Sequence, residues 1–201
     1  MSNYNRIAPF YDRLARLVFG NSLINAQIKY LDLVSAGSSI LILGGGTGKI
    51  LPNLDTTVSG CIIHFIDSSE GMLNLAKDRK LRNNEIVFCT SLDEAGSYYD
   101  VVIVNFFFDQ FTDQKINEII GTLKQKTTDQ TKWLISDFVN PKNAWQYSLL
   151  GLMYGFFKII CSIEAHKLPD WQNVLAQNEL TVHNEHFFYN KFIVSQVFYR
   201  T

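Results

Sequence analysis

The sequence predicts an α/β fold in which a mostly parallel sheet lies between two layers of helices. One observation is an alternation: five short apolar segments that fit strands are separated by segments with the residue spacing of helices. Another is the C-terminal end, where strand patterns at residues 181–188 and 192–199 flank a tight turn at Tyr189-Asn190. This turn predicts a final antiparallel hairpin, and the parallel connections before it should be right-handed.

Composition favours a single domain that acts on a small partner. The chain has 201 residues, 47% of them hydrophobic and 18% charged, which is an ordinary globular balance. The formal net charge of −1 gives no overall field that would attract nucleic acid, so we expect a small-molecule substrate. The three cysteines are widely spaced in apolar stretches, which indicates reduced thiols. Because no early apolar run fits a signal peptide, we expect a cytoplasmic protein.

The first predicted strand, residues 40–43, leads into a glycine-rich bend. Four consecutive apolar residues fit a strand that is buried on both faces. The glycines that follow let the main chain turn tightly and leave no side chains between the backbone and a ligand. A helical pattern resumes at Lys49, so free N–H groups at a helix start should face the same ligand.

Spacing within the bend excludes two ligand-binding patterns. A phosphate loop needs glycine where this chain has Leu43 and a hydroxyl residue where it has Ile50. The dinucleotide pattern G-x-G-x-x-G fits at Gly44 and Gly46 but requires a third glycine where this chain has Lys49. The pattern that remains is G-x-G-x-G.

Asp67 ends the second predicted strand, residues 61–66. An acidic residue at this place, about 20 residues past a glycine bend, can accept hydrogen bonds from both ribose hydroxyls of a nucleoside. That argument applies equally to NAD and to S-adenosylmethionine. Capping of the next helix is the structural alternative for Asp67, since Ser68-Ser69-Glu70 after it is a good helix start.

Three further strands are predicted at residues 86–89, 99–105 and 133–139. Between the last two, isoleucines and a leucine at helical spacing predict a helix that starts at Thr112 or Asp113. Because the carboxyl ends of parallel strands face the ligand in such sheets, the residues that follow each strand are candidate site residues.

Four motifs together resemble the class I S-adenosylmethionine-dependent methyltransferases, in particular the ubiquinone and menaquinone C-methyltransferase-like group. They are the G-x-G-x-G bend, the D-x-S-x-x-M hexapeptide at residues 67–72, the fourth strand at 99–105 and the opening Ile-Ala-Pro-Phe-Tyr-Asp at 7–12. The resemblance implies a Rossmann-like three-layer sandwich with a seven-stranded, mostly parallel sheet, an N-terminal helix and a helical lid.

The resemblance also implies S-adenosyl-L-methionine as the cofactor and a set of residues that bind it. These are Gly44, Gly45, Gly46, Thr47, Gly48, Asp67, Ser68, Met72, Ser91, Leu92, Asn105, Phe106 and, from the lid over the cofactor, Tyr11.

Two of the family's polar anchors are altered in this chain. The family usually has an acidic residue two positions before the first glycine, where this chain has Ile42, and an aspartate near the adenine, where it has Ser91. Asp67 stays as the third anchor.

Residues 140–164 form the least ordinary segment. Asn140 fits a helix cap, Pro141 fits the first helical position, and a stripe from Trp145 through Leu152 to Ile163 fits a long apolar helix. Its apolar run is too short for a membrane span. The resembling family inserts its substrate cover at this point in the chain, so we expect residues 140–164 to form a lid over an apolar substrate pocket. Homodimer contact and membrane-surface docking are the alternative roles for this segment.

His166, Asp137 and Asp109 are the candidate catalytic residues. His166 could act as a general base because the pKa of histidine lies near neutrality. No catalytic side chain is obligatory, since the sulfonium of the cofactor is already an activated leaving group. His183 and His186 point to opposite faces of one strand, so we expect no metal site.

We therefore expect a methyltransferase that acts on a small, lipophilic acceptor. The alternative is a noncatalytic protein that binds S-adenosylmethionine or a nucleoside and works through its lid. The expected organisation is one domain, residues 1–201, with an N-terminal helical cap (1–37), a cofactor-binding core (38–139), a helical lid (140–168) and a C-terminal helix and hairpin (169–201).

Overall fold

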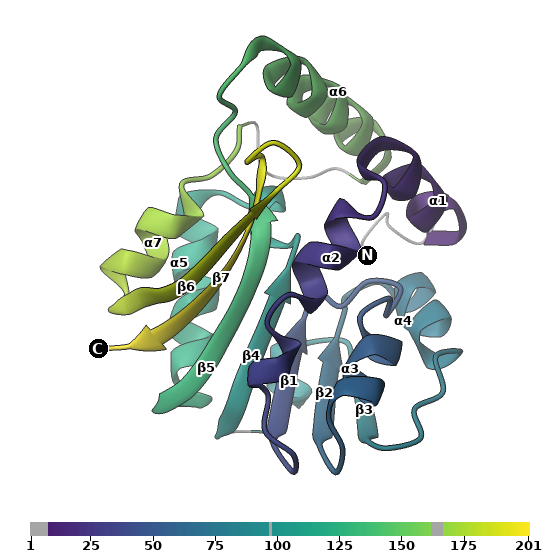
Figure 1. The fold of residues 1–201 in the computed structure, drawn as a ribbon, viewed down its shortest axis with the longest axis vertical. Helices are drawn as coiled ribbons and strands as arrows, with labels where there is room; N and C mark the ends of the chain where they lie inside the picture. Colours follow the sequence, from purple (N-terminus) through teal and green to yellow (C-terminus); the bar gives the residue numbers. More distant parts are fainter. Residues whose placement is uncertain (1–7, 97, 162–166) are drawn as a thin grey trace.

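A computed structural model of the chain describes residues 8–96, 98–161 and 167–201. Within these residues a seven-stranded sheet has the order β3-β2-β1-β4-β5-β7-β6 (Figure 1). Neighbouring strands run parallel from β3 to β5, and β7 is antiparallel to both β5 and β6. The predicted fold is therefore confirmed. The strands are β1 (Ser39–Leu43), β2 (Ile62–Ile66), β3 (Glu85–Cys89), β4 (Tyr99–Asn105), β5 (Thr127–Phe138), β6 (Leu180–Phe188) and β7 (Ile193–Arg200).

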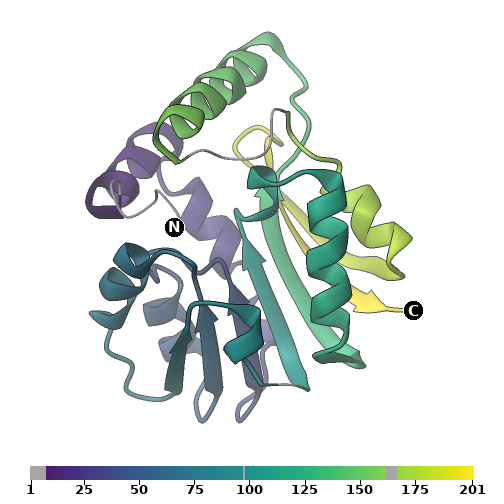
Figure 2. The ribbon, with the colours of Figure 1, turned by 180° about the vertical axis from the view of Figure 1, so that it is seen from behind.

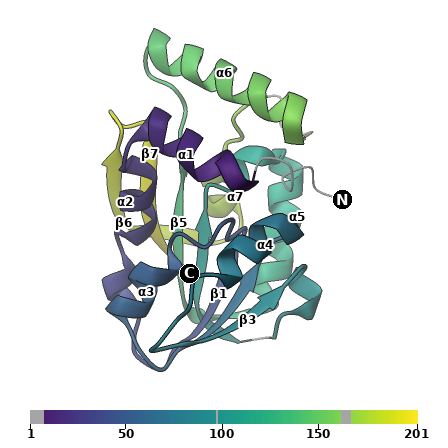
Figure 3. The ribbon, with the colours of Figure 1, turned by 90° about the vertical axis from the view of Figure 1, so that its right-hand side faces the viewer.

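Helices cover both faces of the sheet and the edge where the parallel strands end (Figures 1 and 2). Helices α3 and α4 pack on one face, and α5 and α7 pack on the other. Helices α1 and α6 lie beyond the upper end of the sheet, with α6 above α1 (Figure 3). The α-helices are α1 (Ala8–Phe19), α2 (Ser22–Ile28), α3 (Leu51–Thr57), α4 (Glu70–Lys77), α5 (Asp113–Lys124), α6 (Ala144–Cys161) and α7 (Trp171–Gln177).

The side-chain alternation along β1 divides the core into two clusters. Ile40 and Ile42 belong to the cluster with α3 and α4, whereas Leu41 and Leu43 belong to the cluster with α5. Each of the four is at most 5% exposed. This confirms the expectation of a strand buried on both faces, and it fixes the level at which the glycine bend leaves the sheet.

Helices α4, α5 and α7 have side-chain caps, and the sequence predicts the first two. The Ser69 hydroxyl accepts the N–H of Met72 at 3.2 Å, and the Thr112 hydroxyl accepts the N–H of Lys115 at 3.3 Å. Asp170 caps α7 through the N–H of Asn173. Each of these side chains satisfies an N–H group that has no partner within its helix.

The start of α6 differs from the sequence expectation. Asn140 and Pro141 precede the helix, which begins at Ala144, and the side chain of Asn143 accepts the N–H of Gln146 at 3.3 Å. Asn140 and Asn143 lie on either side of Pro141 in the sequence, and Asn143 is the residue that caps the helix. Strand β5 is also longer than predicted, since it begins at Thr127. Its polar first half pairs with β4 through a register that is irregular between Tyr99 and Val101.

The faces of α6 also differ from the predicted stripe. Leu149, Leu150 and Met153 pack against a third apolar cluster, whereas Leu152 is 70% exposed. Gln146 is fully buried and donates from its amide nitrogen to the main-chain oxygen of Asn190. Sequence spacing alone did not show which of two apolar faces would be turned inward.

Packing at the ends of β5 and β7 holds the N-terminal helices over the sheet. Phe138 stacks against Phe19 and Phe192, with ring centroids 5.3 and 5.2 Å apart. The hydroxyls of Ser136 and Ser195 both donate to the main-chain oxygen of Ala26 in α2, at 3.0 and 2.8 Å. The covering helices are thus joined to the strands that carry the candidate site.

Candidate functional site

The glycine bend lies at the topological switch point of the sheet. Strands β1 and β4 are parallel neighbours, and their last paired residues include Leu43 and Val104. The chain leaves β1 toward α3 on one face and leaves β4 toward α5 on the other. Ligands of open α/β sheets bind where two connections diverge in this way.

Positive backbone φ angles shape the bend. Gly44, Gly46 and Gly48 have φ values of +65°, +58° and +69°, a region that residues with a Cβ rarely adopt. The N–H of Gly45 donates to the Ile66 oxygen at 3.0 Å, which attaches the bend to the end of β2. The sequence expectation of a tight turn made by glycines is confirmed.

The space around the glycines differs from one to the next. A Cβ on Gly45 would overlap the buried ring of Phe65, and one on Gly44 would overlap the ring of Phe107. At Gly46, by contrast, no heavy atom of the described residues would lie within 4 Å of an added Cβ. Gly46 is therefore the glycine whose open side is available to a ligand.

Alanine substitutions should separate these two roles. Gly45→Ala should destabilise the fold by about 2 kcal/mol or more, because the methyl group overpacks against Phe65. Gly46→Ala should cost about 1 kcal/mol through its backbone angle, and should mainly weaken ligand binding. Thermal unfolding together with ligand titration checks both. Equal stability of the two variants would contradict this account.

Asp67 faces the bend from the end of β2. One carboxylate oxygen accepts the N–H of Gly46 at 2.8 Å, and the other accepts the N–H of Ser69 at 2.8 Å. Burial raises the pKa of Asp67, and the two N–H donors oppose that rise. Asp67 thus orders the bend, whereas Ser69 is the residue that caps α4. The Asp67 carboxylate therefore does not act as the helix cap itself.

The other predicted cofactor residues near α3 and α4 differ in their exposure to solvent. Thr47 and Met72 are buried, at 5% and 3% exposure, whereas Ser68 is exposed. Ser91, after β3, is half-buried and donates to a Glu94 carboxylate oxygen at 3.4 Å.

Leu92 and Tyr11 are the other two predicted cofactor residues outside the turn after β4. Leu92 follows Ser91 and packs against the core cluster that includes α5. Tyr11 lies on α1, and its side chain lies outside the described part of the chain.

The chain after β4 turns sharply beside the glycine bend. Asn105 is half-buried, and Phe106 has a φ of +50° with its N–H donating to the Ser136 oxygen at 2.7 Å. The ring of Phe107 lies against Gly44. These residues follow β4 as expected, and the strained angle at Phe106 directs the chain back across the end of the sheet.

Asp137 holds this turn from β5. Its carboxylate is fully buried and accepts the N–H groups of Phe107, Phe108 and Phe138 at 3.2, 2.9 and 2.7 Å. Burial raises the pKa of Asp137 to about 7, although these N–H donors act in the opposite direction. The geometry gives Asp137 a positioning role for residues 106–109.

Asp109 is the buried acid beside it. Its Oδ1 atom is shielded from solvent, and none of the described residues gives that atom a hydrogen bond. Burial first, and then the charge of Asp137, raises the pKa of Asp109 well above its usual value. Two carboxyl groups in such contact do not both ionise readily, so the pair holds a proton near neutral pH.

Tyr154, from α6, completes this group. Its hydroxyl donates to the main-chain oxygen of Asp109 at 2.9 Å, and burial beside the two acids raises its pKa. Sequence reasoning missed Tyr154. Its partner lies 45 residues away along the chain, so no local sequence pattern could have found it.

The histidine and metal predictions are the last to be compared with the structure. His166 lies outside the described residues. The His64 ring packs edge-on against Tyr99, and its buried Nδ1 has no hydrogen-bond partner among the described residues. In the described ranges, no three His, Cys, Asp or Glu side chains are grouped so as to hold a metal ion.

Sequence comparison finds methyltransferases as relatives, and no family model matches the chain. The chain is 32% identical over 127 residues to a malonyl-[acyl-carrier protein] O-methyltransferase from Acetivibrio thermocellus, covering 61% of this chain and 44% of the relative. It is 32% identical over 117 residues to the protein of the same name from Bacillus anthracis, covering 56% and 43%. The chain thus spans less than half the length of these curated relatives.

Solved structures with the same fold cover nearly the whole chain. A TehB-like methyltransferase from Corynebacterium glutamicum superposes with a TM-score of 0.65 at 14% identity, covering 98% of each chain. The S-adenosylhomocysteine-bound magnesium protoporphyrin IX methyltransferase from Synechocystis gives 0.61 at 17% identity, covering 90% of this chain and 86% of that one. The chain has the fold of the class I S-adenosylmethionine-dependent methyltransferases, and part of its sequence is similar to two methyltransferases.

Proposed function

We propose that the glycine bend binds S-adenosyl-L-methionine and that the chain transfers its methyl group to a small acceptor. The observation that carries this proposal is the position of Asp67. Its carboxylate stands at the end of β2, is partly exposed, and is held against the N–H of Gly46 at the switch point.

The residues present fit the nucleoside part of this cofactor. An ionised carboxylate has about four acceptor positions, so Asp67 can take two ribose hydroxyls besides the N–H groups of Gly46 and Ser69. The open side of Gly46 leaves room for the sugar. Ser91 is the candidate for the adenine end of the site.

The methionine part of the cofactor lacks one usual polar anchor. Ile42 stands where the family has an acidic residue, and it is buried in the core with 2% exposure. We expect main-chain groups of the bend to hold the amino acid end instead, with Asn105 and Phe106 beside it. The ring of Phe107 lies against Gly44, so we expect the ring either to contact the bound cofactor or to move away from Gly44 when the cofactor binds.

S-adenosylmethionine would supply an activated methyl group: in-line attack by the acceptor on the methyl carbon would break the methyl–sulfur bond and leave S-adenosylhomocysteine. The chain's own contribution is alignment and exclusion of water, and α6 stands over the ends of the strands in a position to provide both (Figure 3). Asp109 is the candidate base for an acceptor that must lose a proton, in the state in which the proton of the pair lies on Asp137, because the Oδ1 of Asp109 has no described partner.

A small, lipophilic acceptor suits the aromatic residues that gather after β4 and under α6. The curated relatives carry the name of an enzyme for malonyl-[acyl-carrier protein], so an acyl group on a carrier is the alternative acceptor. A noncatalytic S-adenosylmethionine-binding protein is the less favoured reading, because those relatives are methyltransferases.

Calorimetric titration of the purified chain with S-adenosylmethionine, S-adenosylhomocysteine and NAD tests the cofactor. We expect binding of the first two and none of NAD; binding of NAD alone would overturn the proposal. Transfer of a radiolabelled methyl group to lipophilic alcohols, phenols and acyl thioesters then tests catalysis. Cofactor binding without transfer to any of these acceptors would favour the noncatalytic reading.

A further inference from the structure

The outer face of α6 is apolar and exposed. Trp145, Tyr147 and Leu152 are 41%, 62% and 70% exposed, and Ser148, Gly151 and Gly155 are exposed as well. A soluble helix normally presents polar residues on that side, while its apolar residues face the core. In α6 both sides are apolar, and the only charged residue in its 18-residue sequence is Lys158.

Charge is distributed unevenly between the capping segments and the rest of the chain. Along the sequence, residues 1–20, 140–168 and 189–191 contain seven basic and two acidic residues. The rest of the chain contains 11 basic and 17 acidic residues, although the whole chain is nearly neutral. Along the sequence, these capping segments are therefore net basic and the rest of the chain is net acidic.

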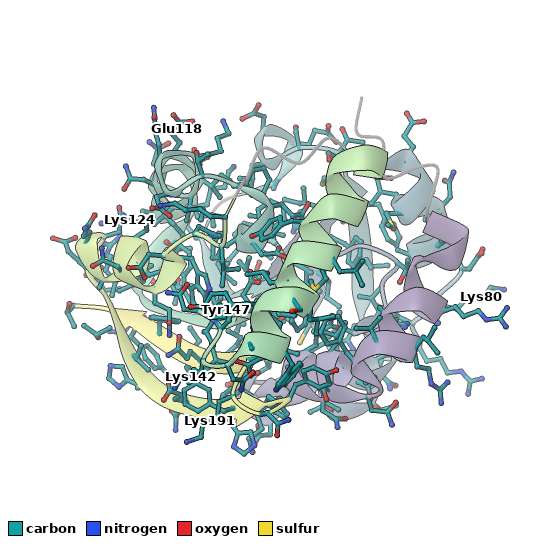
Figure 4. The ribbon with its side chains drawn as sticks, turned by 90° about the horizontal axis from the view of Figure 1, so that it is seen from above. Lys80, Glu118, Lys124, Lys142, Tyr147 and Lys191 are labelled. Carbon is teal, nitrogen blue, oxygen red and sulfur yellow. The ribbon has the colours of Figure 1, made fainter. Side chains whose placement is uncertain are left out.

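Basic side chains border the exposed face of α6. Lys142 and Lys191 lie beside Tyr147 at one end of the helix (Figure 4), and both are exposed. Arg13 and Arg16 are exposed on α1, the next helix below α6, and add basic charge farther from its outer face (Figure 3). Aromatic and aliphatic groups within a basic border match the boundary between lipid headgroups and acyl chains.

We propose that the outer face of α6, with its border of basic residues, docks on an anionic lipid bilayer. Tyr147 and Leu152 would enter the headgroup boundary, and the lysines and arginines would meet lipid phosphates. This is attachment to a surface, because none of the helices in the described ranges has the length and hydropathy to span a bilayer.

Other occupants fit this face less well. A second copy of the chain would place one basic border against another, which is repulsive. An acidic protein would be expected to meet basic side chains on the helix itself, whereas residues 144–155 of α6, whose side chains are described, include no basic residue. A lipid surface needs no pairing of individual charges, so it accommodates this arrangement.

Vesicle flotation of the full chain tests the proposal. We expect binding to vesicles of equal parts phosphatidylcholine and phosphatidylglycerol and little binding to phosphatidylcholine alone. Leu152→Glu and Tyr147→Glu should each reduce binding about tenfold or more, because each removes an inserted apolar group. Val87→Glu is the matched control, since Val87 is 44% exposed on edge strand β3 and should leave binding unchanged.

Tryptophan fluorescence locates the contact. Trp133 and Trp171 are both 1% exposed, so quenching by brominated acyl chains reports on Trp145. We expect quenching only with anionic vesicles. Equal binding to neutral vesicles, unchanged binding of both glutamate variants, or a dimer that Leu152→Glu dissociates would each overturn the proposal. S-adenosylmethionine titration of the same variants should match the wild type, which keeps this test separate from that of the proposed function.

Discussion

Asp67→Ala is expected to weaken S-adenosylmethionine binding about 100-fold, because two hydrogen bonds from ribose hydroxyls to a charged acceptor are lost. Asp67→Asn should have a smaller effect, about tenfold, since the amide keeps one acceptor oxygen but turns an NH₂ donor toward the bend. Calorimetric titration measures both. Because burial raises the pKa of Asp67, wild-type affinity should also fall as the pH is lowered through that raised pKa.

Asp100→Asn is the matched control for this experiment. Asp100 also accepts a main-chain N–H, from Ser39 at 2.8 Å, but it lies at the opposite ends of β1 and β4. Its substitution should leave the affinity unchanged. If Asp67→Ala folds normally, as judged by circular dichroism, and binds the cofactor as tightly as the wild type, the assigned role of Asp67 is wrong.

Asp109→Asn is expected to stabilise the protein at alkaline pH. In the unfolded chain Asp109 and Asp137 titrate near 3.8, whereas in the folded protein burial raises the pKa of Asp109 well above that value and that of Asp137 to about 7. The folded state therefore binds more protons over this range, and wild-type stability falls as the pH rises from about 4 to about 7.

The variant removes one of the two acids and hence the repulsion between them. We expect a gain on the order of 2 kcal/mol near pH 8, or about 5 °C in Tm, and a much smaller gain near pH 5. Asp137→Asn should instead destabilise the fold at each pH. In the wild type the Asp137 carboxylate accepts main-chain N–H groups, and in the variant an NH₂ donor would take the place of one acceptor oxygen. Thermal unfolding between pH 5 and pH 8 measures all three. A wild-type Tm independent of pH would contradict the coupled pair.

The sheet and the bend were predictable from the sequence because local rules determine them. Four apolar residues before glycines fix β1, and the cap signals at Ser69, Thr112 and Asp170 fix the starts of three helices. Asp67 could be singled out because its distance from the bend along the chain is set by one strand–helix–strand unit.

The lid region was predicted less well, because tertiary packing decides it. Both faces of α6 are apolar, so the sequence could not show that Leu152 would face solvent while Leu149 faces the core. The contact of Tyr154 with Asp109 joins positions 45 residues apart and leaves no local pattern. The burial of Asp109 and Asp137 beside each other is a consequence of the same long-range packing.

The most direct test of the central claim is a crystal structure of this chain grown with S-adenosylhomocysteine. The account predicts that both ribose hydroxyls lie within hydrogen-bonding distance of the Asp67 carboxylate, with the sugar on the open side of Gly46. A ligand bound elsewhere on the sheet, or an Asp67 carboxylate that contacts only Gly46 and Ser69 while the ribose is held by other residues, would contradict it.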